Sequence, residues 1–367
     1  MSMVFKKDEI VILLGAGASV DAGIPHSCGM VNKLEQLLGE GKEWADFTNL
    51  YNYVKSAIIF ADGIKGRSGG GFNIERLVAT LDDLRKGDEH PLYPFIGSWA
   101  PKLPEVAGNG LEKLGTFRKL IVQRLRDEWV QLDYNEKASY YGKLCEFQRE
   151  YEHPLRIFTL NYDLCVEKAC TDVTVERGFS EEKTWDWRVF DPSPDQTADI
   201  YLYKMHGSID WERDDSGKVT FRDSVSRINV DNLEIIFGTT YKLQYVDPFL
   251  FFAYELRRWT LSTARLIITV GYGFADEHVN GILGQALKGD RQRRLLAVIG
   301  HHAKADEELE KIGNLLSLGC EEQVKCLCMS AKEFFNSRLS IGELMKEFPN
   351  AEPPFDEVSP TSEEEKE

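Results

Sequence analysis

The chain has 367 residues, of which 43% are hydrophobic and 28% charged, a composition typical of a globular protein with a sizeable core. Its formal net charge of −16 argues against binding nucleic acid unaided, because phosphate backbones require a basic surface. No apolar stretch is long enough to span a membrane. Seven cysteines without a signal peptide favour a reducing compartment, so we expect a cytoplasmic protein.

Short apolar runs rich in β-branched residues predict buried strands along most of the chain. In chain order they cover residues 10–14, 155–160, 200–205, 233–237, 265–270, 295–299 and 324–329. Amphipathic stretches at 248–263, 276–288 and 304–318 predict helices between several of them. Apolar strands alternating with helices indicate an α/β fold, with a Rossmann-like parallel sheet covered on both faces.

The first two predicted strands are separated by a long segment that reads as mostly helical. We therefore expect a large helical insertion over residues 31–150, carried by a single domain over residues 1–347. Within it, the glycine-rich segment Gly63–Gly71 is expected to be a mobile loop that acts as a lid or an interface. The acidic residues 348–367 are expected to form a disordered tail.

A glycine turn, GAGASVDAGIP, follows the first strand at Gly15 and Gly17, and a helix is expected from about Ser19. Glycines let a backbone approach a ligand closely, and free N–H groups at a helix N-terminus bind phosphates. A tight strand-to-helix turn without a ligand remains the alternative. Val20 stands where the dinucleotide fingerprint of hydride-transfer enzymes needs its third glycine, so those enzymes are disfavoured.

Three further motifs occur in order along the chain: FTLNYD (158–163), KMHGSIDW (204–211) and TVGYGFADEHVN (269–280). Together with the glycine turn, they make the sequence resemble the sirtuin-like family, and within it the prokaryotic antiviral members that hydrolyse NAD+. The resemblance implies a pyrophosphate cradle, a residue that holds the nicotinamide end, and a loop on the adenosine side. The cradle is assigned to Gly15, Ala16 and Gly17, with Ser19 assisting, and the nicotinamide end to Asp163. The loop on the adenosine side is assigned to Gly271, Tyr272, Phe274 and Asp276.

Asn161 and His206 are the predicted catalytic residues, and each follows a predicted strand. Cleaving the nicotinamide–ribose bond creates an oxocarbenium-like centre. An asparagine amide can fix a water molecule or the ribose without titrating, and a histidine of ordinary pKa, about 6.5, can accept a proton. Activity is then expected to fall as the pH drops through the histidine range. The alternatives are that Asn161 caps a helix over 162–171 and that His206 is a hydrogen-bonded core residue.

Structural zinc is not expected. Sirtuin deacylases carry two C-x2-C pairs, whereas residues 164–264 contain only Cys165 and Cys170. The favoured function is therefore NAD+ glycohydrolase, with NAD+ as substrate. A protein deacylase or ADP-ribosyltransferase, a non-catalytic nucleotide-binding subunit, and a nuclease within a larger assembly remain alternatives.

Control of the activity is expected as well, because an unrestrained NAD+ hydrolase would drain the cell that makes it. The resemblance implies a homo-oligomer that acts in defence against phage. It also implies a partner, either a hexameric DNA-translocating ATPase or an Argonaute-type protein. We therefore expect low basal activity that a partner or a phage-derived signal raises.

Overall fold

The computed structural model describes residues 5–66, 71–86, 102–191, 197–237, 246–301, 304–318 and 322–346. The expected disordered tail, 348–367, lies outside these ranges, and so do residues 67–70 of the expected glycine-rich loop.

A seven-stranded sheet forms the centre of the molecule, and every pairing within it is parallel. The strand order is β10-β9-β8-β1-β2-β4-β3, so the first strand lies in the middle. The strands are β1 (Ile10–Leu14), β2 (Leu155–Thr159), β3 (Val175–Glu176), β4 (Ile200–Lys204), β8 (Leu266–Val270), β9 (Arg294–Ile299) and β10 (Val324–Cys328). At the carboxyl end of β1, Leu14 pairs with Thr159 on one side and with Val270 on the other.

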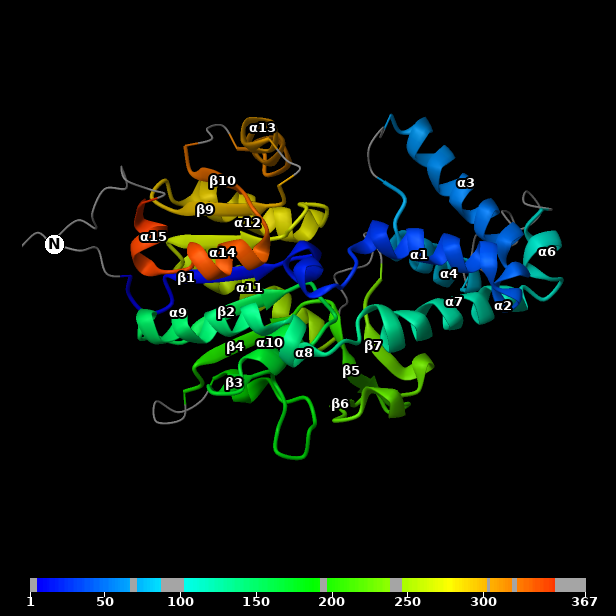
Figure 1. The fold of residues 1–367 in the computed structure, drawn as a ribbon, viewed down its shortest axis with the longest axis horizontal. Helices are drawn as coiled ribbons and strands as arrows, with labels where there is room; N and C mark the ends of the chain where they lie inside the picture. The colour runs from blue at the N-terminus through cyan, green and yellow to red at the C-terminus, as the bar shows by residue number, and fades with distance from the viewer. Residues whose placement is uncertain are drawn as a thin grey trace, which may run out of the picture.

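Helices cover both faces of this sheet, which confirms the predicted Rossmann-like class (Figure 1). On β1, Ile10 and Ile12 belong to the apolar core of one face, while Val11 and Leu13 belong to the core of the other. The first face carries α9 (Lys143–Tyr151), α10 (Cys165–Ala169), α14 (Ala331–Ser337) and α15 (Ile341–Lys346). The second carries α11 (Phe249–Ser262), α12 (Glu277–Gly289) and α13 (Ala305–Leu315).

The segment between β1 and β2 is helical in the described residues and divides into two parts. Figure 1 shows α1 to α7 as a lobe beside the sheet, which we call the helical lobe, whereas α9 returns to the sheet. The helices are α1 (Ser27–Glu40), α2 (Lys42–Ala45), α3 (Thr48–Ile64), α4 (Ile74–Arg85), α6 (Lys102–Ala107), α7 (Glu112–Arg124) with a π-helical turn (Leu125–Trp129), α8 (Tyr134–Lys137) and a 3-10 turn (Ser139–Gly142). Buried side chains of the lobe such as Leu50 and Phe117 join the same apolar core as Ile10, so the lobe packs onto the sheet.

A second, antiparallel sheet corrects one strand prediction. Residues 233–237 were expected in the parallel sheet, but β7 (Leu233–Ile235) pairs antiparallel with β5 (Gly207–Arg213), which also pairs with β6 (Val219–Phe221). The reason is the turn at Gly207, whose φ of 84° reverses the chain directly after β4. A Cβ at Gly207 would lie 2.1 Å from the carbonyl oxygen of Glu234, so the turn and β7 are in direct contact. Short 3-10 turns at Trp187–Phe190, Val225–Arg227 and Val230–Asn232 complete the described elements.

Candidate functional site

The predicted site residues follow β1, β2, β4 and β8, which end at one edge of the parallel sheet. Gly15 comes directly after β1, Asn161 two residues after β2, His206 two residues after β4, and Gly271 directly after β8. Ligands of open α/β sheets bind at this carboxyl edge, at the point where the strand order reverses. In this sheet the chain runs from β1 to β2 on one side and returns to β8 on the other, so the reversal lies at β1.

The glycine turn packs against the loop that follows β8. The Gly15 amide donates to the carbonyl oxygen of Val270 and the Gly17 amide to that of Gly271, both at 2.9 Å. Cβ atoms at Gly15 and Gly17 would lie 2.6 and 2.7 Å from the backbone around Gly271, so glycine is required for this contact. The amides of both glycines are therefore engaged within the protein. Ala16, which is exposed, is the residue of this turn whose amide has no partner among the described residues.

The turn leads into a helix that begins at Ala16, slightly before the expected Ser19, and this helix is a 3-10 helix (Ala16–Ala22). Gly23, with a φ of 95°, ends this short helix, and Pro25 follows it. A left-handed glycine closes a helix, and proline cannot continue one because it has no N–H group. The first α-helix therefore begins later, at Ser27.

Gly271→Ala is expected to destabilise the fold by roughly 2–5 kcal/mol, the sum of a left-handed backbone and a backbone clash. Gly271 has a φ of 62°, and its added Cβ would lie 2.2 Å from the Ala18 nitrogen. Gly273→Ala is the matched control, because a Cβ there meets nothing within 4 Å. Urea unfolding of both variants measures the difference. Equal stabilities would contradict the close contact between the two loops.

Asn161 is tied to the glycine turn by its side chain. Its Nδ2 atom donates to the carbonyl oxygen of Gly15 at 3.0 Å and to Ser19 Oγ at 3.1 Å. Helix α10 begins only at Cys165, whose N–H is bound by Asp163, so the interpretation of Asn161 as a helix cap is wrong. Asn161 is a buried residue, with 8% exposure, and its Oδ1 atom has no hydrogen-bond partner within the described ranges. Because Asn161 lines a pocket, this amide oxygen is available to a ligand.

Ser19, Asn161 and Asp163 form one hydrogen-bonded cluster, which we call the polar cluster. Ser19 Oγ lies 2.6 Å from Asp163 Oδ2 and 2.9 Å from the hydroxyl of Tyr141. Tyr140, from the same 3-10 turn, donates to the carbonyl oxygen of Ala18 at 2.6 Å. Burial, followed by the charges of neighbouring groups, raises the pKa of Tyr141 well above its usual range, so its hydroxyl keeps its proton. The two tyrosines thus fix the turn from outside the motifs.

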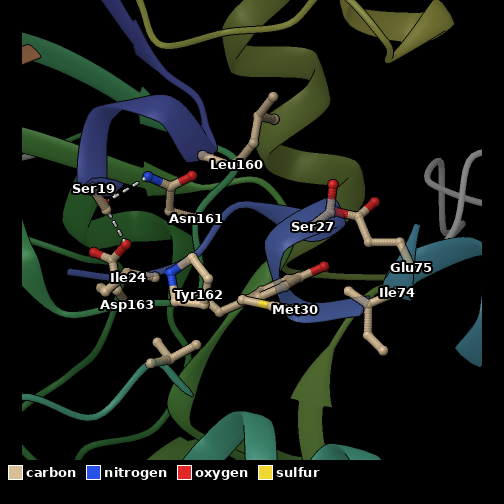
Figure 2. Close-up of a pocket in the computed structure, with 13 residues that line it drawn as sticks. Ser19, Ile24, Ser27, Met30, Ile74, Glu75, Leu160, Asn161, Tyr162 and Asp163 are labelled. Carbon is tan, nitrogen blue, oxygen red and sulfur yellow. Dashed lines mark hydrogen bonds between the residues drawn. The ribbon is translucent and has the colours of Figure 1, made fainter. Parts of the chain in front are cut away.

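A pocket opens against the polar cluster (Figure 2). The loop that follows β2 and the glycine turn supply one side, and the helical lobe supplies the other. The lining residues are Ala16, Ser19, Ile24, Pro25, Ser27, Met30, Ile74, Glu75, Val130, Leu160, Asn161, Tyr162 and Asp163. The pocket thus combines mostly apolar walls with a few polar groups, as small-molecule sites do.

His206 contacts Asp276 across the carboxyl edge. The distance from His206 Nε2 to Asp276 Oδ2 is 3.3 Å, and both side chains are buried. Asp276 is also the N-cap of α12, because its Oδ1 atom accepts the N–H groups of His278 and Val279. The carboxylate is therefore fixed by the helix backbone and can hold the imidazole in one orientation. His206 is not among the described residues that line the pocket of Figure 2.

The loop that follows β8 is buried for much of its length. The rings of Tyr272 and Phe274 pack with centroids 4.6 Å apart, and Tyr272 donates to Asn280 Oδ1 at 2.8 Å. Burial, followed by the charge of Asp276, raises the pKa of Tyr272 well above its usual range. The role of this loop on the adenosine side stays a prediction, as do the roles of Gly271 and Asp276 there.

A network of buried charges lies beneath the polar cluster, and sequence reasoning missed it. Lys204, at the end of β4, is fully buried and donates to the backbone carbonyl of Asp163 and to Glu167. Arg177 pairs with Asp210 at 2.7 Å and lies 3.6 Å from Glu167. Burial by itself would raise the pKa of Asp210, but Arg177 and Lys204 outweigh it, and the pKa is lowered. The network ties the loop after β2 to β4, on which His206 depends.

Within the described ranges, no three His, Cys, Asp or Glu side chains gather closely enough to hold a metal ion. Among the same residues, no helix combines the length and apolar character needed to cross a membrane.

A family model, described as the SIR2-like domain, matches residues 155–317. The match spans Asn161, Asp163, His206 and the loop after β8, and the glycine turn lies before it. A search of curated proteins finds no match to the chain. Residues 155–317 are thus similar to the SIR2-like domain, a kind of domain that binds NAD+.

Proposed function

We propose that this protein is an NAD+ glycohydrolase, which converts NAD+ and water into nicotinamide and ADP-ribose. The observation that carries the proposal is the polar cluster. In the part of the chain that is similar to the SIR2-like domain, Asn161 lines a pocket at the carboxyl edge of the sheet, and its Oδ1 atom has no hydrogen-bond partner among the described residues. The apolar walls around it suit a flat ring such as nicotinamide.

The reaction breaks the bond between C1′ of the ribose and N1 of the nicotinamide ring. The bonding electron pair moves onto the ring nitrogen, so nicotinamide leaves as a neutral molecule. A water oxygen bonds to C1′, and the proton that this water loses passes to a base. The enzyme must hold the bond to be broken, stabilise the positive charge that develops on the ribose, and place the water.

Asn161, Asp163 and His206 divide these tasks in our proposal. The amide oxygen of Asn161 holds a ribose hydroxyl or the attacking water, because its nitrogen is already bound to Gly15 and Ser19. Asp163 binds the nicotinamide end. His206 takes the proton, and Asp276 holds its imidazole in place.

The remaining parts of NAD+ are assigned to the two loops that meet at the reversal point. The exposed amide of Ala16 is the group of the glycine turn best placed to meet a pyrophosphate oxygen, while Gly15 and Gly17 keep the two loops in contact. The loop from Gly271 to Asp276 is assigned to the adenosine side.

Incubation of the purified chain with NAD+, followed by chromatography of the products, tests this proposal. We expect nicotinamide and ADP-ribose in equal amounts and without any acceptor. Release that requires an acylated peptide would favour a deacylase, and labelling of a protein would favour an ADP-ribosyltransferase. NAD+ that binds but is not cleaved, with or without an acceptor, would contradict the proposal.

We extend the proposal to regulation in a homo-oligomer that serves defence against phage, in which a partner or a signal raises a low basal rate. One surface feature supports an interface. The last turns of α3 expose the apolar side chains Ile59, Phe60 and Ile64 by 52%, 70% and 71%. Exposed apolar side chains that gather on one helix are typical of surfaces that another protein covers.

A further inference from the structure

The helical lobe contributes an acidic side chain, Glu75, to the pocket. Figure 2 shows Glu75 beside Ser27, on the opposite side from Ser19 and Asp163. Glu75 and Asp163 are the two charged residues among the thirteen that line the pocket, all of which are described. Lysine, arginine and histidine are absent from this lining. The pocket is therefore an acidic environment in which mostly apolar walls limit the access of water.

The position of Glu75 is fixed by the start of α4. Asn73 caps this helix by accepting the N–H of Arg76 at 2.9 Å, and Glu75 lies in the first turn. The buried residues Leu77 and Leu81 hold the helix in the core of the lobe. The neighbouring cation, Arg76, is directed to Asp62 of α3, with Nη2 and Oδ1 2.8 Å apart.

The charge of Glu75 acts within the pocket. Burial, followed by the negative charge of Glu75, raises the pKa of Tyr162 well above its usual range. Tyr162 lines the pocket, and its hydroxyl donates to the carbonyl oxygen of Ile236 at 2.7 Å. Asp163, the other carboxylate of the lining, accepts hydrogen bonds from Ser19 and from the Cys165 amide.

We propose that Glu75 selects the positively charged, oxidised nicotinamide ring, so that the pocket takes NAD+ in preference to NADH. This inference rests on the proposed function, because it assigns the pocket to the nicotinamide end. A carboxylate beside a poorly hydrated ring attracts its positive charge. The attraction is lost when the bond to ribose breaks and nicotinamide becomes neutral, so Glu75 favours the substrate over the product.

Two small probes test the charge alone: 1-methylnicotinamide, which is a permanent cation, and nicotinamide, which is neutral. Their equilibrium binding to the full chain is measured by titration calorimetry, with no turnover involved. Glu75→Gln keeps the size of the side chain and removes its charge. It is expected to weaken the binding of 1-methylnicotinamide about tenfold, the size of a partly screened attraction between two charges, and to leave nicotinamide within about twofold.

Asp83→Asn is the matched control, because it removes one negative charge from the exposed far end of the same helix. It is expected to change neither affinity, while Glu75→Asp retains most of the preference for the cation. In the unmodified chain, added salt should weaken the cation more than the neutral probe, which tests the attraction without any substitution.

Equal weakening of both probes in Glu75→Gln, or no weakening of either, would overturn the assignment. So would a wild-type chain that binds neither probe. These outcomes differ from a failure of the proposed function, which would appear as an absence of NAD+ cleavage in the product assay whatever the probes do.

Discussion

Asn161→Ala and His206→Ala are each expected to lower NAD+ cleavage by about 10³-fold or more. Removing a general base, or a hydrogen bond made to the reacting centre, commonly reduces the rate by factors of about 10² to 10⁴. Asn161→Ala also removes the two hydrogen bonds that tie the loop after β2 to the glycine turn. The initial rate of nicotinamide release at saturating NAD+ measures both effects.

Asn314→Ala and His153→Ala serve as controls, because Asn314 is exposed on α13 and His153 comes before β2, at the opposite end of the strands from the predicted site. They are expected to keep the wild-type rate. Circular dichroism and urea unfolding separate a loss of chemistry from a loss of fold. If folded Asn161→Ala and His206→Ala proteins both cleave NAD+ at the wild-type rate, the mechanism proposed above is wrong.

Asp276→Asn is expected to lower the maximal rate about 10²-fold, by weakening the group that orients His206. Asparagine still caps α12, because its oxygen can accept the N–H groups of His278 and Val279. The negative charge facing His206 Nε2 is lost, and that charge favours the protonated imidazole. Without the negative charge of Asp276, the imidazole loses its proton more readily, so the acid side of the pH–rate profile moves to lower pH.

Glu277→Gln is the control for this prediction, since it removes a charge from the adjacent, exposed position of the same helix. Its profile is expected to match that of the wild type. A purely structural role for Asp276 would lower the rate without moving the profile, and that result would exclude Asp276 as the positioning partner of His206.

The sheet could be predicted because its signal is local. Runs such as 10–14 and 266–270 are apolar on both faces, which is the pattern of a buried parallel strand. The antiparallel pairing of 233–235 could not be read in the same way, because it depends on the reversal at Gly207. A glycine in a motif does not reveal which way the chain turns after it.

The position of the motif residues at the ends of strands could be predicted, but their partners could not. Asn161 and His206 stand in recognisable sequence patterns. Tyr141 and Glu75 occur in helical stretches whose composition is ordinary, and Lys204 reads as one more polar residue at a strand end. They approach the site only through contacts between segments far apart in the chain. Such contacts are set by tertiary packing and leave no periodic mark in the sequence.

The position of the helical lobe between two neighbouring strands sets when the site can form. Val11 on β1 pairs with Arg156 on β2 and with Ile267 on β8, so each pairing closes a loop of well over a hundred residues. Closing a long loop costs conformational entropy, and this cost slows the assembly of a sheet. During synthesis, β1 leaves the ribosome long before either neighbour exists. The contact between the glycine turn and Gly271 therefore waits for about three quarters of the chain. A growing chain therefore has no complete carboxyl-edge site until the loop that follows β8 has been synthesised.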